Sequence, residues 1–369
     1  MIRQRIRWIG VGIVAALWAV LTLFAWFGPS QAFSDAERRP LEQLPQLSGK
    51  TLLSGDFMTD FESYTLDQFP LRDTFRQLKA LTHTYVLQQK DNNDIYMAQG
   101  FAAEMEYPLD EASVKHALKQ FQSVYDKYLK DSGSTVIAAV VPDKSYYLAH
   151  ESGHLAMDYE KLFSMVREGM PWATHVDLTG SLSLQDYYFT DTHWRQERIL
   201  PAAGLLAQNL GVTQPKAEDF TQRAAGRPFY GVYHGQAALP MPPETLYLME
   251  NEIISGCTVT GYDSLGKETK RKVYDDADLQ AKDLYDIYLS GMESILVIDN
   301  PNAATDRELV IFRDSFGSSL APLLLSDYAR VTLVDIRYIS VDALSKFVDF
   351  HGQDTLFLYS TLVLNKNLI

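Results

Sequence analysis

The sequence predicts an α/β fold with a mostly parallel sheet and helices on both faces, preceded by one N-terminal transmembrane helix. Three observations lead to this prediction: a long uncharged apolar run near the N-terminus, apolar segments without polar alternation, and amphipathic helical patterns between those segments. Strands that alternate with helices favour a parallel sheet, because each crossover lays a helix against one face of the sheet.

The apolar run is long enough to cross a membrane. The 20 residues from Trp8 to Phe27 carry no charge, and as a helix rising about 1.5 Å per residue they match a hydrocarbon layer of about 30 Å. Arg3, Arg5 and Arg7 precede the run, so the positive-inside rule predicts a signal anchor in the cell membrane with the chain after Gly28 outside. A cleaved signal peptide is the alternative, although its apolar region is usually only about 7–15 residues.

The rest of the chain is predicted to be a linker and one large domain. Residues 1–30 are the cytoplasmic tip and anchor, the polar residues 31–55 with two prolines are the linker, and residues 56–369 are the domain. Helical spacing is predicted at 56–89, 110–130, 159–168, 197–210, 316–325 and 341–347. Extended segments are predicted at 135–141, 175–178, 294–298, 309–312, 331–334 and 355–359. A β-rich insertion is expected near 213–282, where both patterns weaken.

Charge and cysteine content narrow the classes of function. The formal net charge of −14 argues against nucleic acid as a partner, because a phosphate-backbone binder needs a basic face. A neutral, hydroxyl-rich substrate suits this chain better. Cys257 is the single cysteine, so no intrachain disulfide forms. No cofactor is expected.

Ser315 is the first candidate for a catalytic residue. It follows the predicted strand 309–312 across a turn and opens a predicted helix, which places it at the carboxyl end of a strand where α/β proteins bind ligands. The helix N-terminus would offer N–H groups and a positive dipole end to an oxyanion. The alternative is that Ser315 or Ser318 simply caps the helix.

A second motif, Thr190-Asp191-Thr192-His193-Trp194, lies just before a predicted helix. With one residue between Asp191 and His193, the carboxylate can hold the imidazole while the other ring nitrogen accepts a proton from a serine. Alternatively, Asp191 or Thr192 caps the helix and His193 lies at the surface.

Together and in this order, the two motifs resemble the DHHW protein family and the related SGNH-hydrolase-like domains of alginate O-acetyltransferases. Nearly the whole chain after the anchor takes part, and further similar segments are Phe61–Asp73, Val141–Lys144, Phe229–Gly231, Val334–Tyr338 and the final extended stretch. Position by position, the resemblance places the family's Asp-x-His on Asp191 and His193 and its serine on Ser315. Two positions depart: Thr192 replaces a histidine, and Arg313 stands where the alginate enzymes have glycine.

The resemblance implies an SGNH-like (flavodoxin-like) fold and a Ser-His-Asp triad. The implied reaction is acyl transfer, of acetyl above all, to a cell-surface polysaccharide, with acetylesterase activity where water is the acceptor. A multi-spanning membrane-bound O-acyltransferase is the implied partner. The residues themselves leave two other classes open, a non-catalytic glycan-binding or scaffold protein and a zinc hydrolase.

Three further residues are candidates for the oxyanion hole or for substrate contact. The backbone N–H of Ser315 is expected to donate to the oxyanion, and that of Gly231 is the second candidate. Lys144 follows a predicted strand and a proline, so it is expected at the same sheet edge, either against substrate or solvated. Tyr230 can stack on a sugar ring or belong to the core. Arg337 is expected to pair with Asp335.

The string His150-Glu151-Ser152-Gly153-His154 matches the zinc-peptidase pattern H-E-x-x-H. A zinc site of this kind needs one solid helix that carries both histidines on the same face. Gly153 interrupts the string, and no apolar helical stripe surrounds it. We therefore predict that the pair holds no metal.

Overall fold

The computed structural model describes residues 2–263, 266–289 and 293–369. They form two compact units. The anchor unit comprises Met1–Asn93 and His234–Met241, and the sheet unit comprises Asp94–Tyr233 and Pro242–Ile369. The sequence suggested a boundary at residue 56, whereas the structure groups residues 56–93 with the apolar helix.

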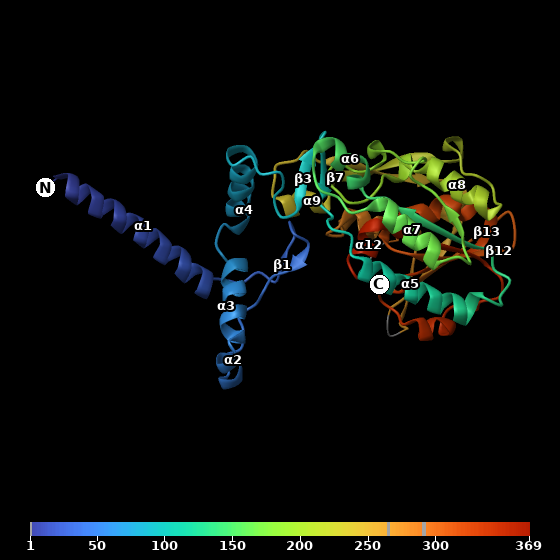
Figure 1. Cartoon of the computed structure of the whole chain (residues 1–369), viewed down its shortest axis with the longest axis horizontal. Coiled ribbons are helices and arrows are strands. Elements are labelled where there is room, and N and C mark those ends of the chain that lie inside the picture. Colours follow the sequence, from blue (N-terminus) through green and yellow to red (C-terminus); the bar gives the residue numbers. More distant parts are fainter. Residues whose placement is uncertain (1, 264–265, 290–292) are drawn as a thin grey trace. The chain divides into compact units, whose positions relative to one another are not determined.

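The anchor unit is mostly helical. Its elements are α1 (Ile2–Phe27), the hairpin strands β1 (Phe33–Ser34) and β2 (Arg39–Pro40), α2 (Gly49–Ser54), α3 (Asp56–Asp67), α4 (Arg72–Leu81) and the π-helical turn η1 (Thr82–Val86). Within α1, residues Arg5–Phe27 are long and apolar enough to cross a membrane. Figure 1 shows α2 and α3 following one another, with α1 beside α3.

Ion pairs join the predicted linker to the helices of the anchor unit. Arg39 donates two hydrogen bonds to Asp67, of 2.8 and 2.6 Å, and this contact lowers the pKa of the Asp67 carboxyl. Arg72 and Arg76 both pair with Glu37. Residues 31–55 therefore hold a hairpin and a short helix, and charged contacts fix the hairpin to α3 and α4.

The sheet unit is built on one eight-stranded sheet. In spatial order its strands are β10 (Glu268–Arg271), β9 (Thr258–Tyr262), β11 (Ile295–Asp299), β13 (Tyr328–Val334), β12 (Arg307–Arg313), β14 (Asp354–Ser360), β5 (Val136–Val141) and β6 (Thr174–Val176). The five strands from β13 to β6 are parallel, and β10, β9 and β11 add antiparallel pairs. The predicted mostly parallel sheet is confirmed. β11 runs antiparallel to β13, because the short connection 300–306 joins β11 to β12 without room for a crossover, and β12 lies parallel to β13.

Helices cover both faces of this sheet, as predicted (Figure 1). Along β12, Leu309 and Ile311 enter one core cluster, whereas Val310 and Phe312 enter the other, because successive side chains of a strand point to opposite faces. The first cluster packs on α8 (Leu200–Leu210), α11 (Ser315–Leu320) and η8 (Ala321–Asp327). The second packs on α5 (Glu111–Val124), η2 (Tyr125–Leu129), α7 (Tyr159–Gly169) and α12 (Thr361–Asn365).

Antiparallel hairpins occupy the segment where the sequence pattern weakens. β7 (Thr221–Phe229) pairs with β8 (Glu244–Glu250), and β9 with β10 extends the main sheet. Residues 264 and 265 of this segment lie outside the described part of the chain.

The remaining elements are β3 (Ile95–Ala98), β4 (Phe101–Glu104), α6 (Lys144–Ser152), η3 (Leu184–Asp186), η4 (Gln196–Arg198), η5 (Ala217–Asp219), α9 (Val232–Ala237), α10 (Glu252–Gly256), η6 (Asp276–Gln280), η7 (Leu284–Tyr288) and η9 (Val341–Lys346).

Candidate active site

Ser315 lies where the sequence predicts it, at the carboxyl end of β12 and the first residue of α11. The preceding Asp314 is fully buried and fixes the turn. One of its carboxylate oxygens accepts a hydrogen bond from Phe316 N (3.0 Å) and the other accepts one from Ser360 N (2.7 Å) at the end of the neighbouring β14. Two parallel strand ends therefore determine the position of Ser315.

Arg313 points away from this turn into the protein. Its guanidinium is buried 3.8 Å from Asp335, and burial lowers its pKa. Its side chain passes so close to Gly317 that a Cβ there would lie 2.6 Å from the Arg313 Cβ. The Arg313 side chain therefore packs directly beneath α11. Arg337 forms the predicted ion pair with Asp335, with contacts of 2.8 and 2.6 Å.

The structure brings Asp191, His193 and Ser315 into one hydrogen-bonded chain. The Nδ1 of His193 is 2.6 Å from Asp191 Oδ1, and the Nε2 is 2.7 Å from Ser315 Oγ. Asp191 Oδ1 also accepts a bond from the backbone N–H of His193 (3.0 Å). The carboxylate is fully buried and the imidazole is nearly so. This is the geometry in which an imidazole can accept the serine proton while the carboxylate fixes its tautomer.

Gly231 and Val232 hold the aspartate from the other side. Val232 N donates to Asp191 Oδ2 (2.8 Å), and Gly231 N donates to Thr190 Oγ1 (2.9 Å). A Cβ on Gly231 would lie 2.2 Å from the carbonyl oxygen of Thr190, so only glycine allows this approach. The amide of Gly231 is therefore occupied by Thr190, which corrects its expected role as the second oxyanion donor.

Two charged side chains, those of the buried Lys144 and the partly buried Glu244, hold the loop that carries Asp191 and His193. Glu244, the first residue of β8, accepts hydrogen bonds from the backbone N–H groups of Phe189 and Thr190, both at 2.8 Å. The Nζ of Lys144 donates to the carbonyl oxygen of Tyr188 (2.9 Å). Burial lowers the pKa of Lys144 to about 7, although Asp191 and Glu244 oppose that shift.

Lys144 is thus neither a solvated lysine nor a surface contact for substrate, the two roles that the sequence suggested. Its ammonium lies 4.9 Å from the ring centroid of Tyr233. The preceding Asp143 is also buried, and its carboxylate accepts bonds from Tyr159 Oη (2.9 Å) and Thr361 Oγ1 (2.8 Å). The Val141–Lys144 segment therefore stabilises the surroundings of the site through buried polar contacts.

Aromatic rings fix the plane of the imidazole. The ring of Tyr285 stacks on His193 with centroids 3.8 Å apart and an interplanar angle of 10°. Tyr285 Oη and Trp194 Nε1 both lie 2.8 Å from Ser319 Oγ, so α11 contacts both sides of the histidine motif. Sequence reasoning missed Tyr285 and Glu244, because neither belongs to a short motif or to a regular pattern.

Tyr230 lies exposed beside the candidate site. Its side chain is 46% exposed, and it directly precedes the glycine that packs against Thr190. This position is compatible with the predicted stacking on a sugar ring.

The two histidines of the zinc-peptidase string do not share a helix. A helix that the sequence pattern did not indicate, α6, is present but ends at Ser152, and Gly153 follows with a left-handed φ of 69°. The His154 ring stacks on Tyr96 with centroids 3.9 Å apart. Among the described residues, no group of three His, Cys, Asp or Glu side chains is placed to hold a metal ion.

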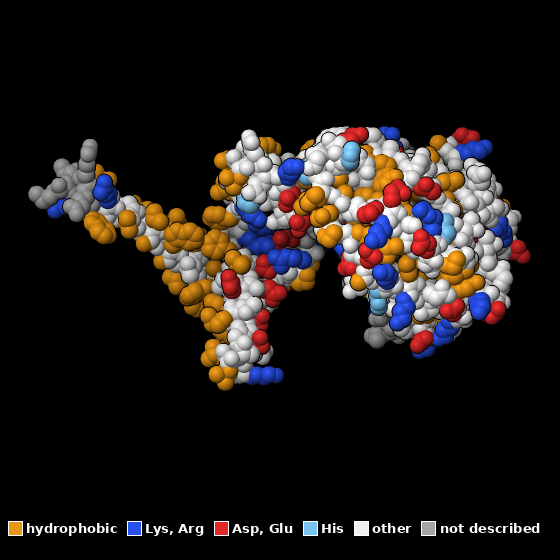
Figure 2. Space-filling model, in the orientation of Figure 1, with side chains coloured by type: hydrophobic (Ala, Val, Ile, Leu, Met, Phe, Trp, Pro, Cys, Tyr) orange, Lys and Arg blue, Asp and Glu red, His pale blue; other side chains and the backbone are white. Residues whose placement is uncertain are grey.

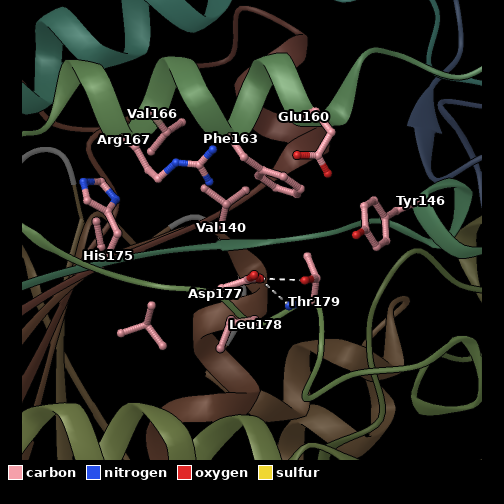
Figure 3. Close-up of a pocket in the computed structure, with 12 residues that line it drawn as sticks. Val140, Tyr146, Glu160, Phe163, Val166, Arg167, His175, Asp177, Leu178 and Thr179 are labelled. Carbon is pink, nitrogen blue, oxygen red and sulfur yellow. Dashed lines mark hydrogen bonds between the residues drawn. The ribbon is translucent and has the colours of Figure 1, made fainter.

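A separate hollow of about 150 Å³ lies between α7 and the edge strand β6. Figure 3 shows Glu160, Phe163 and Arg167 of α7 on one side of it and Asp177 and Thr179 on the other. Asp177 Oδ1 accepts bonds from the backbone N–H and the hydroxyl of Thr179, at 2.9 and 2.7 Å. The residues that line this hollow include none of the three in the hydrogen-bonded chain.

Comparison with solved structures identifies the class of fold. A DHHW family protein from Eubacterium siraeum DSM 15702 matches with a TM-score of 0.60 at 18% identity, over 75% of this chain and 94% of that one. Bacillus cereus PatB1 with a sulfonyl adduct matches with a TM-score of 0.61 at 16% identity, over 74% and 96%. The O-acetyltransferase domain of Pseudomonas putida AlgJ matches with a TM-score of 0.43 at 16% identity, over 74% and 92%.

No family model and no curated protein matches the sequence. The chain has the fold found in the DHHW family protein and in PatB1, which confirms the fold that the sequence resemblance implied.

Proposed function

We propose that this chain is a membrane-anchored SGNH-type acyltransferase that transfers an acyl group, acetyl above all, to a polysaccharide outside the cell. One observation carries the proposal: the hydrogen-bonded chain Asp191–His193–Ser315 at the carboxyl edge of the sheet. The likeness of the fold to a DHHW family protein supports it. So does a fold neighbour that carries a sulfonyl adduct, because sulfonyl reagents modify activated nucleophiles.

In the first half of the proposed reaction, Ser315 Oγ attacks the carbonyl carbon of an acyl ester. His193 Nε2 accepts the hydroxyl proton, and Asp191 stabilises the imidazolium that forms. The oxyanion develops near the backbone N–H of Ser315, which we propose as one donor. When the tetrahedral intermediate collapses, the ester C–O bond breaks, His193 returns the proton to the leaving oxygen, and an acyl-serine remains.

In the second half, a hydroxyl group of the acceptor attacks the acyl-serine. His193 takes the proton of that hydroxyl, the bond between acyl carbon and Ser315 Oγ breaks, and the serine recovers a proton from the imidazolium. A sugar hydroxyl makes the protein a transferase, and water makes it an esterase. Access of water to the acyl-serine decides between them, since the same three residues serve both.

The membrane side of the proposal rests on the N-terminus. Arg5–Phe27 is apolar enough to span a bilayer, and the arginines before Trp8 favour a cytoplasmic N-terminus. We therefore propose that the sheet unit acts outside the cytoplasm. From the resemblance to alginate O-acetyltransferases, we also propose that a multi-spanning membrane-bound O-acyltransferase supplies the acyl group.

The chemistry is tested by hydrolysis of a small activated acetyl ester by purified full-length protein. We expect slow hydrolysis by the wild type and almost none by Ser315→Ala. Ser164→Ala is a control, because Ser164 lies on α7 and its hydroxyl donates to Glu168 on the same helix (2.9 Å). Unchanged hydrolysis by a folded Ser315→Ala protein would refute the mechanism. A folded wild type that binds glycan but never forms an acyl-enzyme would favour a binding or scaffold protein instead.

The topology is tested separately by protease treatment of intact cells. We expect the sheet unit to be digested while a cytoplasmic marker protein survives. If the sheet unit survives under conditions that digest a known surface protein, the proposed orientation is wrong, whatever the purified protein does with esters.

A further inference from the structure

One face of helix α4 in the anchor unit is charged, and its arginines form contacts within that unit. Arg72 and Arg76 project from this face to Glu37, and Arg76 also donates to the backbone carbonyl of Gly235 (2.9 Å). Arg72 and Arg76 are one turn apart, so these contacts define one side of the helix. The other side of α4 has a different composition.

That other side is apolar and exposed. Leu71, Phe75 and Leu78 follow the i, i+4, i+7 spacing of one helix face, and their side chains are 68%, 43% and 58% exposed. The following turn η1 adds Tyr85 and Val86, both more than two-thirds exposed. Single exposed apolar residues are common on soluble proteins, but a contiguous stripe of this length marks a surface that meets an apolar partner.

The stripe is continuous with the apolar surface of α1. The ring of Phe75 packs against Phe69 with centroids 5.5 Å apart, and Phe69 lies 6.5 Å from Trp18, in the interior of the apolar segment of α1. Nearer the end of α1, Trp26 packs on Phe61 at 5.7 Å. Figure 2 shows hydrophobic side chains along α1 and along the adjoining side of the α2–α4 helices, with charged side chains gathered on the opposite side.

We infer that α4 and η1 lie in the headgroup region of the same bilayer that α1 crosses, with Leu71, Phe75 and Leu78 among the acyl chains. A helix with one apolar and one charged face binds the membrane interface in this way. Lipid is the occupant that the structure favours, because Phe69 and Phe75 continue the apolar surface of α1, whose residues Arg5–Phe27 are apolar enough to cross a membrane. The ion-paired cluster around Glu37 then faces water. This inference depends on the proposed function only through the membrane anchor α1.

The test measures how deeply labels on α4 sit in the bilayer. Single cysteines replace Leu78, Asp73 and Leu17 in the full-length protein, each carries a nitroxide, and the proteins are reconstituted in phosphatidylcholine and phosphatidylglycerol vesicles. Asp73 is the matched control, because it lies on α4 itself, beside Arg72 and Arg76. Cys257 stays in place, since it is buried and burial raises its thiol pKa to about 11.

We expect the label at position 78 to collide at least about five times more often with oxygen, relative to a water-soluble nickel complex, than the label at position 73. Equal exposure of both labels to nickel, with the position 17 label in lipid, would overturn the inference and leave the anchor intact. A position 17 label in water would overturn both. A position 78 label shielded from oxygen and nickel alike would also overturn it, because a second copy or another protein would then cover the stripe.

Discussion

The two halves of the candidate site are held in place by different means. Ser315 stands at the end of a central strand in the parallel part of the sheet, and Asp314 caps the turn through Phe316 N and through Ser360 N at the end of the adjacent strand. His193 lies on an irregular loop closed by one bridge between Tyr187 and Trp194, and Glu244 and other distant residues position that loop. The nucleophile therefore depends on regular secondary structure, whereas the base depends on polar contacts between segments far apart in sequence.

The largest effect is expected where the two halves meet. Ser315→Ala and His193→Ala should each lower kcat for an activated acetyl ester by at least about 1000-fold, because a nucleophile and its base act as one unit. The double variant should be little worse than either single variant. Steady-state hydrolysis by the three variants checks this, with circular dichroism to confirm folding. If the two single-variant losses in kcat multiplied in the double variant, the hydrogen bond between the two side chains would have no role in the reaction.

Asp191→Asn should have the next largest effect, on the histidine half alone. The asparagine keeps one acceptor oxygen, for the backbone N–H of either His193 or Val232, and it no longer stabilises the imidazolium. We expect kcat to fall by roughly 1000-fold with a small change in KM. Stopped-flow measurement of the acylation step separates this from slow deacylation. A fall of less than tenfold would mean that the carboxylate only caps the loop.

Glu244→Gln tests whether remote contacts position the base. The glutamine keeps one acceptor oxygen for the N–H groups of Phe189 and Thr190 but loses the second, so the loop should loosen. We expect kcat to fall about tenfold while KM is unchanged, because Glu244 positions His193 and does not touch substrate. Glu250→Gln, at the other end of β8 and paired with Arg223 at 2.8 Å, is the matched control and should leave kcat unchanged.

Lys144→Met tests the contact of Lys144 with the same loop through the free energy of unfolding of the protein. Because burial lowers the pKa of Lys144 from 10.5 to about 7, the unfolded chain binds more protons than the folded chain between these pH values. The free energy of unfolding of the wild type should therefore rise with pH through this window, relative to that of Lys144→Met. Thermal unfolding midpoints of both proteins at pH 6.5 and pH 9 measure the difference. A difference that is the same at both pH values would show that this lysine stays protonated when buried.

The smallest effect is expected at the exposed edge of the site. Tyr230→Ala removes an exposed ring, so KM for a polysaccharide acceptor should rise about threefold to tenfold if that ring stacks on a sugar. Hydrolysis of a small ester should not change, since Tyr230 takes no part in the hydrogen-bonded chain. A comparable loss with both substrates would instead indicate that Tyr230 supports the neighbouring Gly231 contact.

The nucleophile lies on regular secondary structure and the base on an irregular loop, and this difference explains how much of each half the sequence could predict. The strand before Ser315 was predictable, because a strand buried on both faces is uniformly apolar. Asp191 and His193 were found as a motif, since they are two residues apart. Glu244 lies in the hairpin segment whose alternation is weak, and its contacts with the loop span more than 50 residues, so no local pattern reveals them.

Two misassigned roles have the same physical cause. Gly231 and Lys144 were correctly placed near the site, but their partners could not be read from the chain. The amide of Gly231 bonds to Thr190, and the ammonium of Lys144 bonds to the carbonyl of Tyr188. Strand direction likewise depends on connections: a strand at 294–298 was predicted and lies at Ile295–Asp299, and its antiparallel direction follows from the short loop that joins it to β12.

The most direct measurement is to identify the residue that a sulfonyl fluoride modifies. Full-length protein is treated with phenylmethanesulfonyl fluoride, digested and mapped by mass spectrometry. We expect one stoichiometric adduct on Ser315, with labelling strongly slowed in His193→Ala, because the imidazole must remove the hydroxyl proton as the S–O bond forms and fluoride leaves. Labelling of another residue in the wild type, or labelling of Ser315 at the same rate without His193, would contradict the proposed activation of this serine.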